Sequence, residues 1–361
     1  MHCMDQPVRI KGRGAASNPE GRFETIAREA VDDGWEREAE PAPHPATQVT
    51  EERARSIISR NDSPDIPFEQ SINPYRGCEH GCIYCYARPS HAYLNLSPGL
   101  DFETKLFAKT NALEQLRVEW ARPGYRVSPI NLGANTDPYQ PIERRYRITR
   151  QILQGMLEQR HPVSIVTKNA LVERDLDLLV PLAQQNLVYV FVSVTSLDNK
   201  LSSKLEPRAS APHRRIAALK ALSAAGVPCG VLVAPIIPML TDRWMEQILE
   251  RAQEAGAQMA GYTILRLPWE LKQLVREWLE LHFPERAGHV LSLVRQMRGG
   301  RDNDPRFGKR MRGEGEFAEL IRQRFAVATR RLDLARGRNL SLDCTRFVAP
   351  RKATPQGELF G

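Results

Sequence analysis

The feature that most constrains the fold is an alternation of short β-rich runs and longer helical stretches, which begins near residue 67. Alternation of this kind is typical of a parallel sheet built from βα units. Residues 188–194 are almost all β-branched or apolar, as expected of a strand buried on both faces. We predict six strands, over residues 68–73, 126–133, 163–167, 188–194, 229–234 and 259–265.

Six consecutive βα units predict an α/β fold in the form of a partial (β/α)6 barrel. Its incomplete wall leaves a lateral opening for a large substrate, and in such barrels the chemistry lies at the C-terminal ends of the strands. Beyond residue 268 the pattern is helical only. We therefore divide the chain into an irregular N-terminal arm, the barrel, a helical C-terminal extension and an irregular tail, at residues 1–62, 63–267, 268–336 and 337–361.

Three of the six cysteines, Cys78, Cys82 and Cys85, lie within eight residues directly after the first predicted strand. The spacing C-x3-C-x2-C does not place them on one helical or strand face, and Gly77 and Gly81 give a loop the freedom to wrap a cluster. Three thiolates hold three irons of a [4Fe–4S] cluster. The fourth iron is then open to a small molecule, as in a catalytic metal site.

A zinc knuckle is the alternative interpretation of this cysteine loop. Structural zinc requires four ligands, and the nearby candidates for the fourth are His80 and His91. A disulfide framework is less expected, because a 361-residue chain with 42% hydrophobic residues can bury a core without covalent links.

The charge balance favours a polyanionic partner. The chain has 51 Lys and Arg against 43 Asp and Glu, a net charge of +8, and would attract nucleic acid, although many enzymes are equally basic. No apolar run approaches the roughly 20 residues needed to span a membrane, and the N-terminus has no signal-peptide core. We therefore expect a cytoplasmic protein without a membrane partner, in a reducing compartment that suits an oxygen-sensitive cluster.

The cysteine loop, with Tyr84 immediately before its last cysteine, resembles that of the radical S-adenosylmethionine (SAM) superfamily. Residues 73–87 and the run Glu206-Pro207-Arg208-Ala209 resemble the branch of spore photoproduct lyase-related, DNA repair photolyase-type proteins. The resemblance covers about residues 63–267.

This resemblance implies two cofactors, a [4Fe–4S] cluster and S-adenosyl-L-methionine, together with an external electron donor. Reductive cleavage of SAM yields a 5′-deoxyadenosyl radical, which abstracts hydrogen from the substrate. The leading hypothesis is a lyase-like radical SAM enzyme acting on damaged or modified DNA. The alternatives are a radical SAM enzyme that modifies RNA, protein or a small molecule, and a non-catalytic, zinc-stapled protein that binds nucleic acid.

The resemblance also suggests which residues bind SAM. Lys168 would pair with its carboxylate, Asp137 and Thr136 would bind the ribose, Ser193 would bind the methionyl group, and Tyr84 would pack on the adenine. Each has an ordinary structural alternative: a helix start for Lys168, a turn for Thr136 and Asp137, a core hydroxyl for Ser193 and packing for Tyr84.

One departure from the family concerns the hydrogen donor. Spore photoproduct lyase resembles this chain but has a cysteine just after the second strand, which returns a hydrogen atom to the product radical. Residues 133–137 contain no cysteine here, so either Cys344 or a tyrosine such as Tyr139 replaces the donor, or the reaction differs.

The tail contains a short motif of a different kind. Gln356, Leu359 and Phe360 resemble the Q-x-x-L-F peptide by which bacterial DNA enzymes bind the DNA sliding clamp. The sequence thus predicts DNA as a substrate and the sliding clamp as a possible partner.

Overall fold

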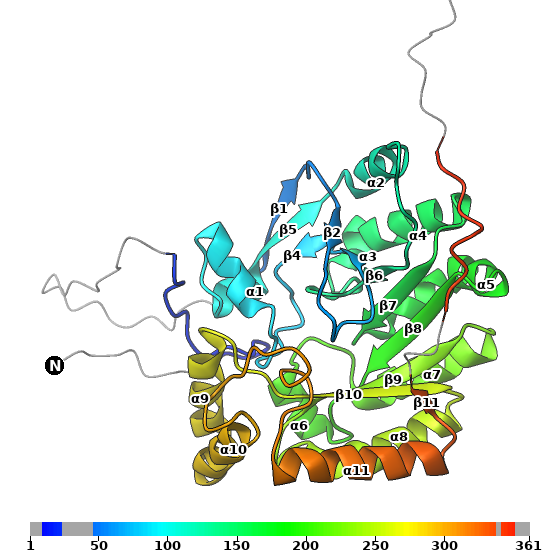
Figure 1. The fold of residues 1–361 in the computed structure, drawn as a ribbon. Coiled ribbons are helices and arrows are strands. Elements are labelled where there is room, and N and C mark those ends of the chain that lie inside the picture. The colour runs from blue at the N-terminus through cyan, green and yellow to red at the C-terminus, as the bar shows by residue number, and fades with distance from the viewer. Residues whose placement is uncertain (1–8, 24–45, 337–340, 351–361) are drawn as a thin grey trace, which may run out of the picture.

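An eight-stranded sheet forms the centre of the protein in a computed structural model, which describes residues 9–23, 46–336 and 341–350 (Figure 1). The strand order is β11-β10-β9-β8-β7-β6-β3-β2. All neighbours are parallel except β2, which runs antiparallel to β3. The strands are β2 (Ile58–Arg60), β3 (Gln70–Ile72), β6 (Ile130–Leu132), β7 (Val163–Thr167), β8 (Val188–Ser193), β9 (Cys229–Ile236), β10 (Met259–Ile264) and β11 (Ala335–Arg336).

Helices connect the successive parallel strands from β6 to β10. They are α3 (Glu143–Tyr146), α4 (Ile148–Glu158), η2 (Ala170–Asp175), α5 (Leu176–Gln184), α6 (Asn199–Leu205), α7 (Pro212–Ala224), η3 (Asp242–Trp244) and α8 (Met245–Glu254). The predicted α/β class and partial (β/α)6 barrel are confirmed, with β3, β6, β7, β8, β9 and β10 as the six barrel strands. Strand β7 has the predicted bounds, whereas β3 and β6 are shorter than predicted.

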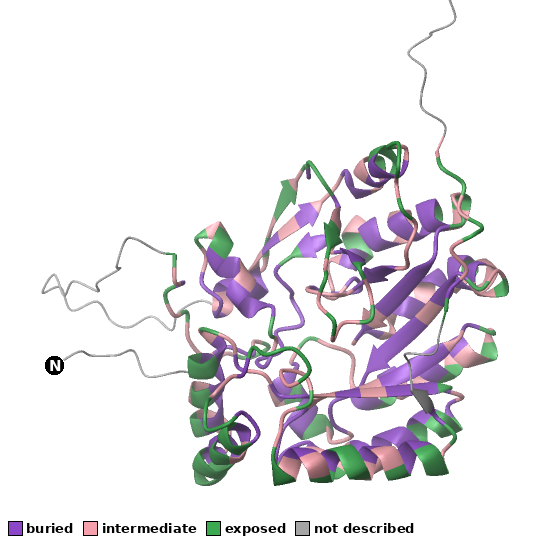
Figure 2. Cartoon of the chain, viewed as in Figure 1, coloured by how far each residue is buried: buried purple, intermediate pink, exposed green. Residues whose placement is uncertain are grey.

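The sheet forms the main hydrophobic core with its helices (Figure 2). Strands β7 and β8 are buried on both faces because helices lie outside the sheet and side chains fill its inner face. Helix α8 contributes Met245, Ile248, Leu249 and Ala252, whose spacing gives one apolar stripe facing the core. Burying a side chain such as Leu249 contributes roughly 1.5–3 kcal/mol to folding.

A second sheet of three strands, formed by segments that precede β6 in the sequence, was not predicted. Strand β5 (Lys105–Lys109) pairs in parallel with β1 (Gln48–Glu52) and antiparallel with β4 (Tyr75–Arg76). Both β1 and β2 fall within residues 1–62, which we expected to be irregular. Helices η1 (Arg88–Leu94), α1 (Leu100–Thr104) and α2 (Ala112–Trp120) complete this region.

The helical extension packs in two places. Helices α9 (Leu271–His282) and α10 (Pro284–Gln296) form a second hydrophobic core with α6 and residues 82–84. Helix α11 (Glu316–Arg331) lies instead against α8 and β10, where the rings of Phe325 and Tyr262 are 4.6 Å apart. None of the helices in the described ranges is both long and apolar enough to cross a membrane.

One loop crosses the open side of the barrel. Residues 298–312 run between α10 and α11, and the Met311 carbonyl accepts a hydrogen bond from the Ile264 amide, at the end of β10, at 3.0 Å. On the opposite edge of the sheet, Arg310 pairs with Asp65 in the connection between β2 and β3. Arg298 holds the loop by donating to the carbonyls of Leu265, Lys309 and Arg310. We call residues 298–312 the bridging loop.

Candidate active site

The cysteine loop begins directly after β4 and is held by backbone hydrogen bonds. The Cys78 amide donates to the Phe102 carbonyl at 2.9 Å, and the Ile83 amide donates to the Leu205 carbonyl at 3.0 Å. Gly77 and Gly81 have φ values of +72° and +66°, which favour glycine. At Gly81 a Cβ atom would also lie 2.7 Å from a Glu103 carboxylate oxygen. The two glycines therefore fix the path of the loop between α1 and α6.

The three thiols of this loop lie in an environment that disfavours free thiolates. Cys78 and Cys82 are buried, and Cys85 is partly buried. Burial raises the pKa of Cys78 well above its ordinary value, with further contributions from Asp137 and the two neighbouring thiols. Burial also raises the pKa of Cys82 and of Cys85. Iron would offset these costs, because it supplies positive charge to three thiolates that otherwise repel one another.

A buried polar network lies beside the loop, at the ends of β7 and β8. Glu206 is its centre: it accepts hydrogen bonds from the Tyr84 hydroxyl and from Thr195 Oγ1, and it pairs with the buried Arg215. Lys168 Nζ lies 3.8 Å from Glu206 Oε1 and donates to Ser193 Oγ at 2.6 Å. Three residues predicted to bind SAM, Tyr84, Lys168 and Ser193, thus converge on one network.

Glu206 was not among the predicted site residues. It is 2% exposed, and after burial its charge is the largest contribution that raises the pKa of Cys82. Lys168 acts in the opposite direction on Cys82, while burial lowers the pKa of Lys168 itself. The only sequence signal for Glu206 was the run 206–209, which supported the family resemblance without indicating a role.

Asp137 and Thr136 are engaged within the protein. The Asp137 carboxylate accepts hydrogen bonds from Thr167 Oγ1 at 2.8 Å and from the Lys168 amide at 2.7 Å. Although burial opposes ionisation, the charge of His80, whose Nδ1 is 3.4 Å from Oδ2, and these hydrogen bonds lower the pKa of Asp137. Thr136 Oγ1 donates to the Tyr75 carbonyl. Both side chains therefore hold the turn after β6 against β7 and β4, and their predicted contact with the ribose stays a prediction.

The sequence pattern of the Radical SAM superfamily matches residues 72–252, half of the chain. The chain belongs to the radical SAM superfamily. The matched segment begins at the last residue of β3, includes the cysteine loop and ends in α8, so it covers four of the six barrel strands in full, β6, β7, β8 and β9.

Relatives of this radical SAM protein occur in bacteria and archaea. An uncharacterised protein of Mycobacterium tuberculosis is 40% identical over 235 residues, which cover 64% of this chain and 68% of the relative. An uncharacterised protein of Methanocaldococcus jannaschii is 30% identical over 195 residues, covering 54% and 70%.

Solved structures of spore photoproduct lyase have a similar fold. The complex with dinucleoside spore photoproduct gives a TM-score of 0.58 at 17% identity and covers 80% of both chains. A variant with bound S-adenosylmethionine and the same dinucleoside gives 0.59 at 17% identity and covers 81% of this chain and 82% of the other. At this identity the likeness concerns the fold.

The cofactors of this radical SAM protein are a [4Fe–4S] cluster and S-adenosylmethionine. A four-iron cluster takes one thiolate per iron, so its ligands do not converge on a single point. Within the described ranges, no group of three or more His, Cys, Asp or Glu side chains is arranged to hold one metal ion. Membership of the radical SAM superfamily favours the cluster over the zinc alternative, and His91 contacts the Lys105 carbonyl through Nε2 at 2.9 Å.

The two candidate hydrogen donors lie in different surroundings. Tyr139 is fully buried in the main core beside Glu143 and Arg174, and its hydroxyl has no hydrogen-bond partner among the described residues. Cys344 follows Asp343, whose amide donates to the Asn186 carbonyl just before β8. That contact places Cys344 at the amino ends of the strands, opposite the cysteine loop. This position does not favour Cys344 as the hydrogen donor.

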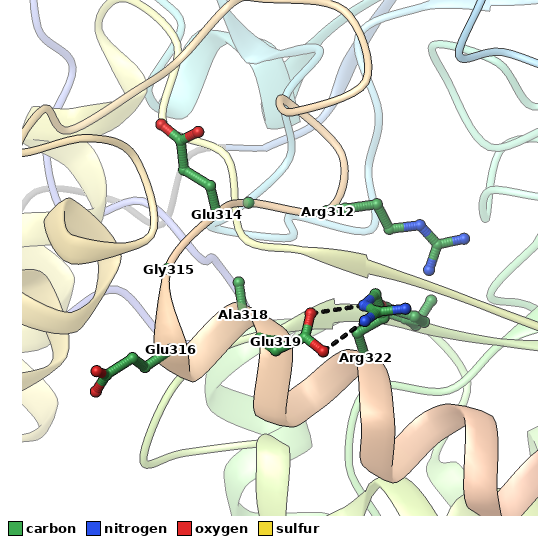
Figure 3. Close-up of a pocket in the computed structure, with 9 residues that line it drawn as sticks. Arg312, Glu314, Gly315, Glu316, Ala318, Glu319 and Arg322 are labelled. Atoms are coloured by element: carbon green, nitrogen blue, oxygen red, sulfur yellow. Dashed lines mark hydrogen bonds and ion pairs between the residues drawn. The ribbon is translucent and has the colours of Figure 1, made fainter.

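An open pocket of about 470 Å³ lies apart from the radical SAM site, at the start of α11 (Figure 3). Arg312 lies over the Tyr262 ring there, 3.9 Å from its centroid, and Glu319 pairs with Arg322. None of the predicted site residues lines this pocket. The predicted clamp-binding residues Gln356, Leu359 and Phe360 lie outside the described residues and stay a prediction.

Proposed function

We propose that this protein is a radical SAM enzyme that acts on damaged or modified DNA. The observation that carries the proposal is the bridging loop, which lies across the open side of the barrel. It contains six basic residues against two acidic ones, Asp302 and Asp304. A substrate that enters through the open side would therefore meet positive charge before it reaches the strand ends, as a nucleic acid requires.

Among polyanions, we favour DNA because a protein of similar fold has been solved with a nucleoside ligand. Spore photoproduct lyase, which has a similar fold, has been solved with a dinucleoside photoproduct. The overall charge of +8 is consistent with a nucleic-acid substrate but does not distinguish DNA from RNA. The experiment must therefore compare the two.

We assign the cofactor contacts to the residues that the site brings together. Cys78, Cys82 and Cys85 would hold the cluster, and Lys168 would bind the SAM carboxylate while Glu206 and Ser193 orient its ammonium group. When bound, the cofactors supply a carbon-centred radical that removes hydrogen from the substrate.

The test is DNA-dependent radical chemistry. Anaerobically reconstituted protein, reduced with dithionite, is mixed with SAM and with ultraviolet-irradiated DNA, intact DNA or RNA of the same sequence. We expect irradiated DNA to increase the yield of 5′-deoxyadenosine, and deuterium from labelled DNA to appear in that product. Stimulation by RNA alone, or no deuterium transfer from any DNA, would contradict the proposal.

A further inference from the structure

We propose that Arg266 binds a phosphate group of the nucleic-acid substrate at the mouth of the barrel, by which we mean the C-terminal ends of its strands. This inference rests on the proposed function and names the residue that anchors the substrate there. Arg266 lies two residues after β10, and its guanidinium carbon is 5.6 Å from the centroid of the Tyr86 ring. Tyr86 directly follows Cys85.

Tyr86 places Arg266 in relation to the other strand ends. The Tyr86 hydroxyl donates to the carbonyl of Ala134, which follows β6, and Tyr86 as a whole residue is 49% exposed. Tyr86 therefore extends from the cysteine loop to the end of β6, with Arg266 from the end of β10 beside its ring. A group bound by Arg266 would lie at the mouth, next to the cysteine loop.

The guanidinium of Arg266 lacks a strong acceptor in the described part of the chain. Its Nε is buried without a hydrogen-bond partner, and Nη1 reaches only the thioether sulfur of Met311, at 3.5 Å. Thioether sulfur is a weak acceptor, and a buried donor without a partner is destabilising. An oxyanion would supply the missing acceptors.

Other buried arginines do have strong acceptors. Arg88 pairs with Glu103, Arg215 pairs with Glu206, and Arg298 donates to four backbone carbonyls. The negative charge of Asp65 raises the pKa of Arg266, but the Asp65 carboxylate is already bonded to Arg310 through both oxygens. Arg266 is thus a partly buried cation whose site is complete only when an anion binds.

The surroundings favour a phosphate on a polyanion. Burial lowers the pKa of Arg266, and the neighbouring charge of Arg310 lowers it further. The bridging loop also carries Arg301 and Arg312, whereas its Arg306, Lys309 and Arg310 pair with Asp304, Glu314 and Asp65. A guanidinium binds a phosphate through two parallel hydrogen bonds, and a phosphodiester chain would follow the loop to Arg266.

The SAM carboxylate is a less suitable ligand for Arg266. Lys168 already lies at the end of β7, within the Glu206 network, whereas Arg266 follows β10 and neighbours the bridging loop. The affinity for SAM therefore serves as the measurement that separates the two ligands.

The experiment compares Arg266→Gln, Arg266→Lys and Arg251→Gln in the full chain with its cluster. Arg251 is an exposed residue on α8, which leads to the amino end of β10, far from the mouth. Binding of a fluorescein-labelled oligonucleotide is followed by anisotropy at several salt concentrations. Melting temperature, iron content and SAM affinity are recorded for each variant.

We expect Arg266→Gln to weaken DNA binding roughly tenfold or more, because a charge-assisted contact is lost. The slope of log K against log salt should become less negative by roughly 0.7–0.9, the value for one phosphate contact. Arg266→Lys should keep the slope but bind several-fold more weakly, since it retains charge without the paired donors. Arg251→Gln should bind within about twofold of the unmodified protein.

Three outcomes would overturn the inference. Unchanged affinity and salt slope in Arg266→Gln would show that Arg266 does not contact phosphate. A loss of SAM affinity without a change in DNA affinity would assign Arg266 to the cofactor. If the unmodified protein binds no nucleic acid, the proposed function falls, and the assignment of Arg266 falls with it.

Discussion

Arg310 and Asp65, 245 residues apart in the sequence, form a paired contact across the open side of the barrel. Arg310 Nε is 2.8 Å from Asp65 Oδ2, and Nη2 is 2.5 Å from Oδ1. Both side chains are largely buried, at 16% and 8% exposure. This ion pair links the bridging loop to the β2 edge of the sheet, so a large substrate that enters the barrel from this side must displace it.

Replacing Asp65 by asparagine should loosen the bridging loop. The change removes one charge from the pair and should destabilise the protein by about 1–3 kcal/mol, the range for a hydrogen bond to a charged group. Trypsin should then cut earlier within residues 298–312, which contain one lysine and five arginines. The matched control is Glu319→Gln, because the Glu319–Arg322 pair is exposed to solvent and should contribute little to stability. Equal cleavage rates in the two variants would contradict the assignment.

The same ion pair predicts a pH dependence. The hydrogen bond from Arg310 holds the pKa of Asp65 below its ordinary value. A lowered carboxyl pKa stabilises the fold above the unfolded-state value of about 4, and this contribution is lost as the pH falls through the folded-state pKa. Below about pH 4, the difference in melting temperature between the unmodified protein and Asp65→Asn should therefore shrink. A difference that stays constant from pH 7 to pH 3 would exclude this coupling.

The cysteines provide a direct test of the cluster assignment. Cys82→Ala should abolish both the broad absorbance at roughly 400 nm and the formation of 5′-deoxyadenosine from SAM, since one iron loses its ligand. Cys344→Ser is the control, because Cys344 is partly buried at the opposite end of the strands. It should retain the iron content and SAM cleavage of the unmodified protein. Formation of 5′-deoxyadenosine by Cys82→Ala would be incompatible with the proposed ligand set.

The barrel strands were predictable because their burial leaves a strong local pattern. Residues 163–167 form an apolar, β-rich run, and β7 has these bounds because both of its faces are covered. Strand β1 gave no such signal: its sequence, QVTEE, is exposed or half-buried along its length, at the edge of a small sheet. Apolar periodicity does not mark a strand that buries little surface.

The part of the site formed by a local sequence motif was predictable. The part formed by contacts between distant segments was not. The cysteine spacing is local, whereas Glu206 acquires its role from Tyr84, Lys168 and Arg215, which come from three other segments. The Asp137 carboxylate likewise turns inward because amide and hydroxyl donors of β7 lie beside it. Single polar residues give no sequence signal for such contacts, since the partners are brought together only by the fold.

Replacing Glu206 by glutamine should destabilise the protein strongly. The side chains of Arg215 and Glu206 are 1% and 0% exposed, so the change leaves buried cations without their counter-charge. Loss of one partner of a buried ion pair costs about 3–5 kcal/mol. Glu250→Gln is the control, because the Glu250–Arg331 pair is exposed and should contribute at most about 1 kcal/mol. Urea denaturation measures both, and a loss below about 1 kcal/mol for Glu206→Gln would argue against a charged network.

The N-terminal residues 13–15 form a cover over the cysteine loop, and Gly14 is its most restrictive position. The amides of Gly14 and Ala15 donate to the Glu103 carboxylate at 3.0 and 2.8 Å. A Cβ atom on Gly14 would lie 1.8 Å from the Gly81 carbonyl oxygen. Gly14→Ala must therefore displace either the cover or the loop.

We expect Gly14→Ala to lower stability by about 1–3 kcal/mol, the usual cost of overpacking, and to accelerate bleaching of the cluster in air. Gly288→Ala is the matched control: Gly288 lies in α10 with nothing within 4 Å of an added Cβ. That change should raise stability by roughly 0.5–1 kcal/mol, because alanine is the better helix former. The two alanine substitutions should thus act in opposite directions on the melting temperature. A Gly14→Ala protein with unchanged melting temperature and bleaching rate would show that residues 13–15 do not protect the loop.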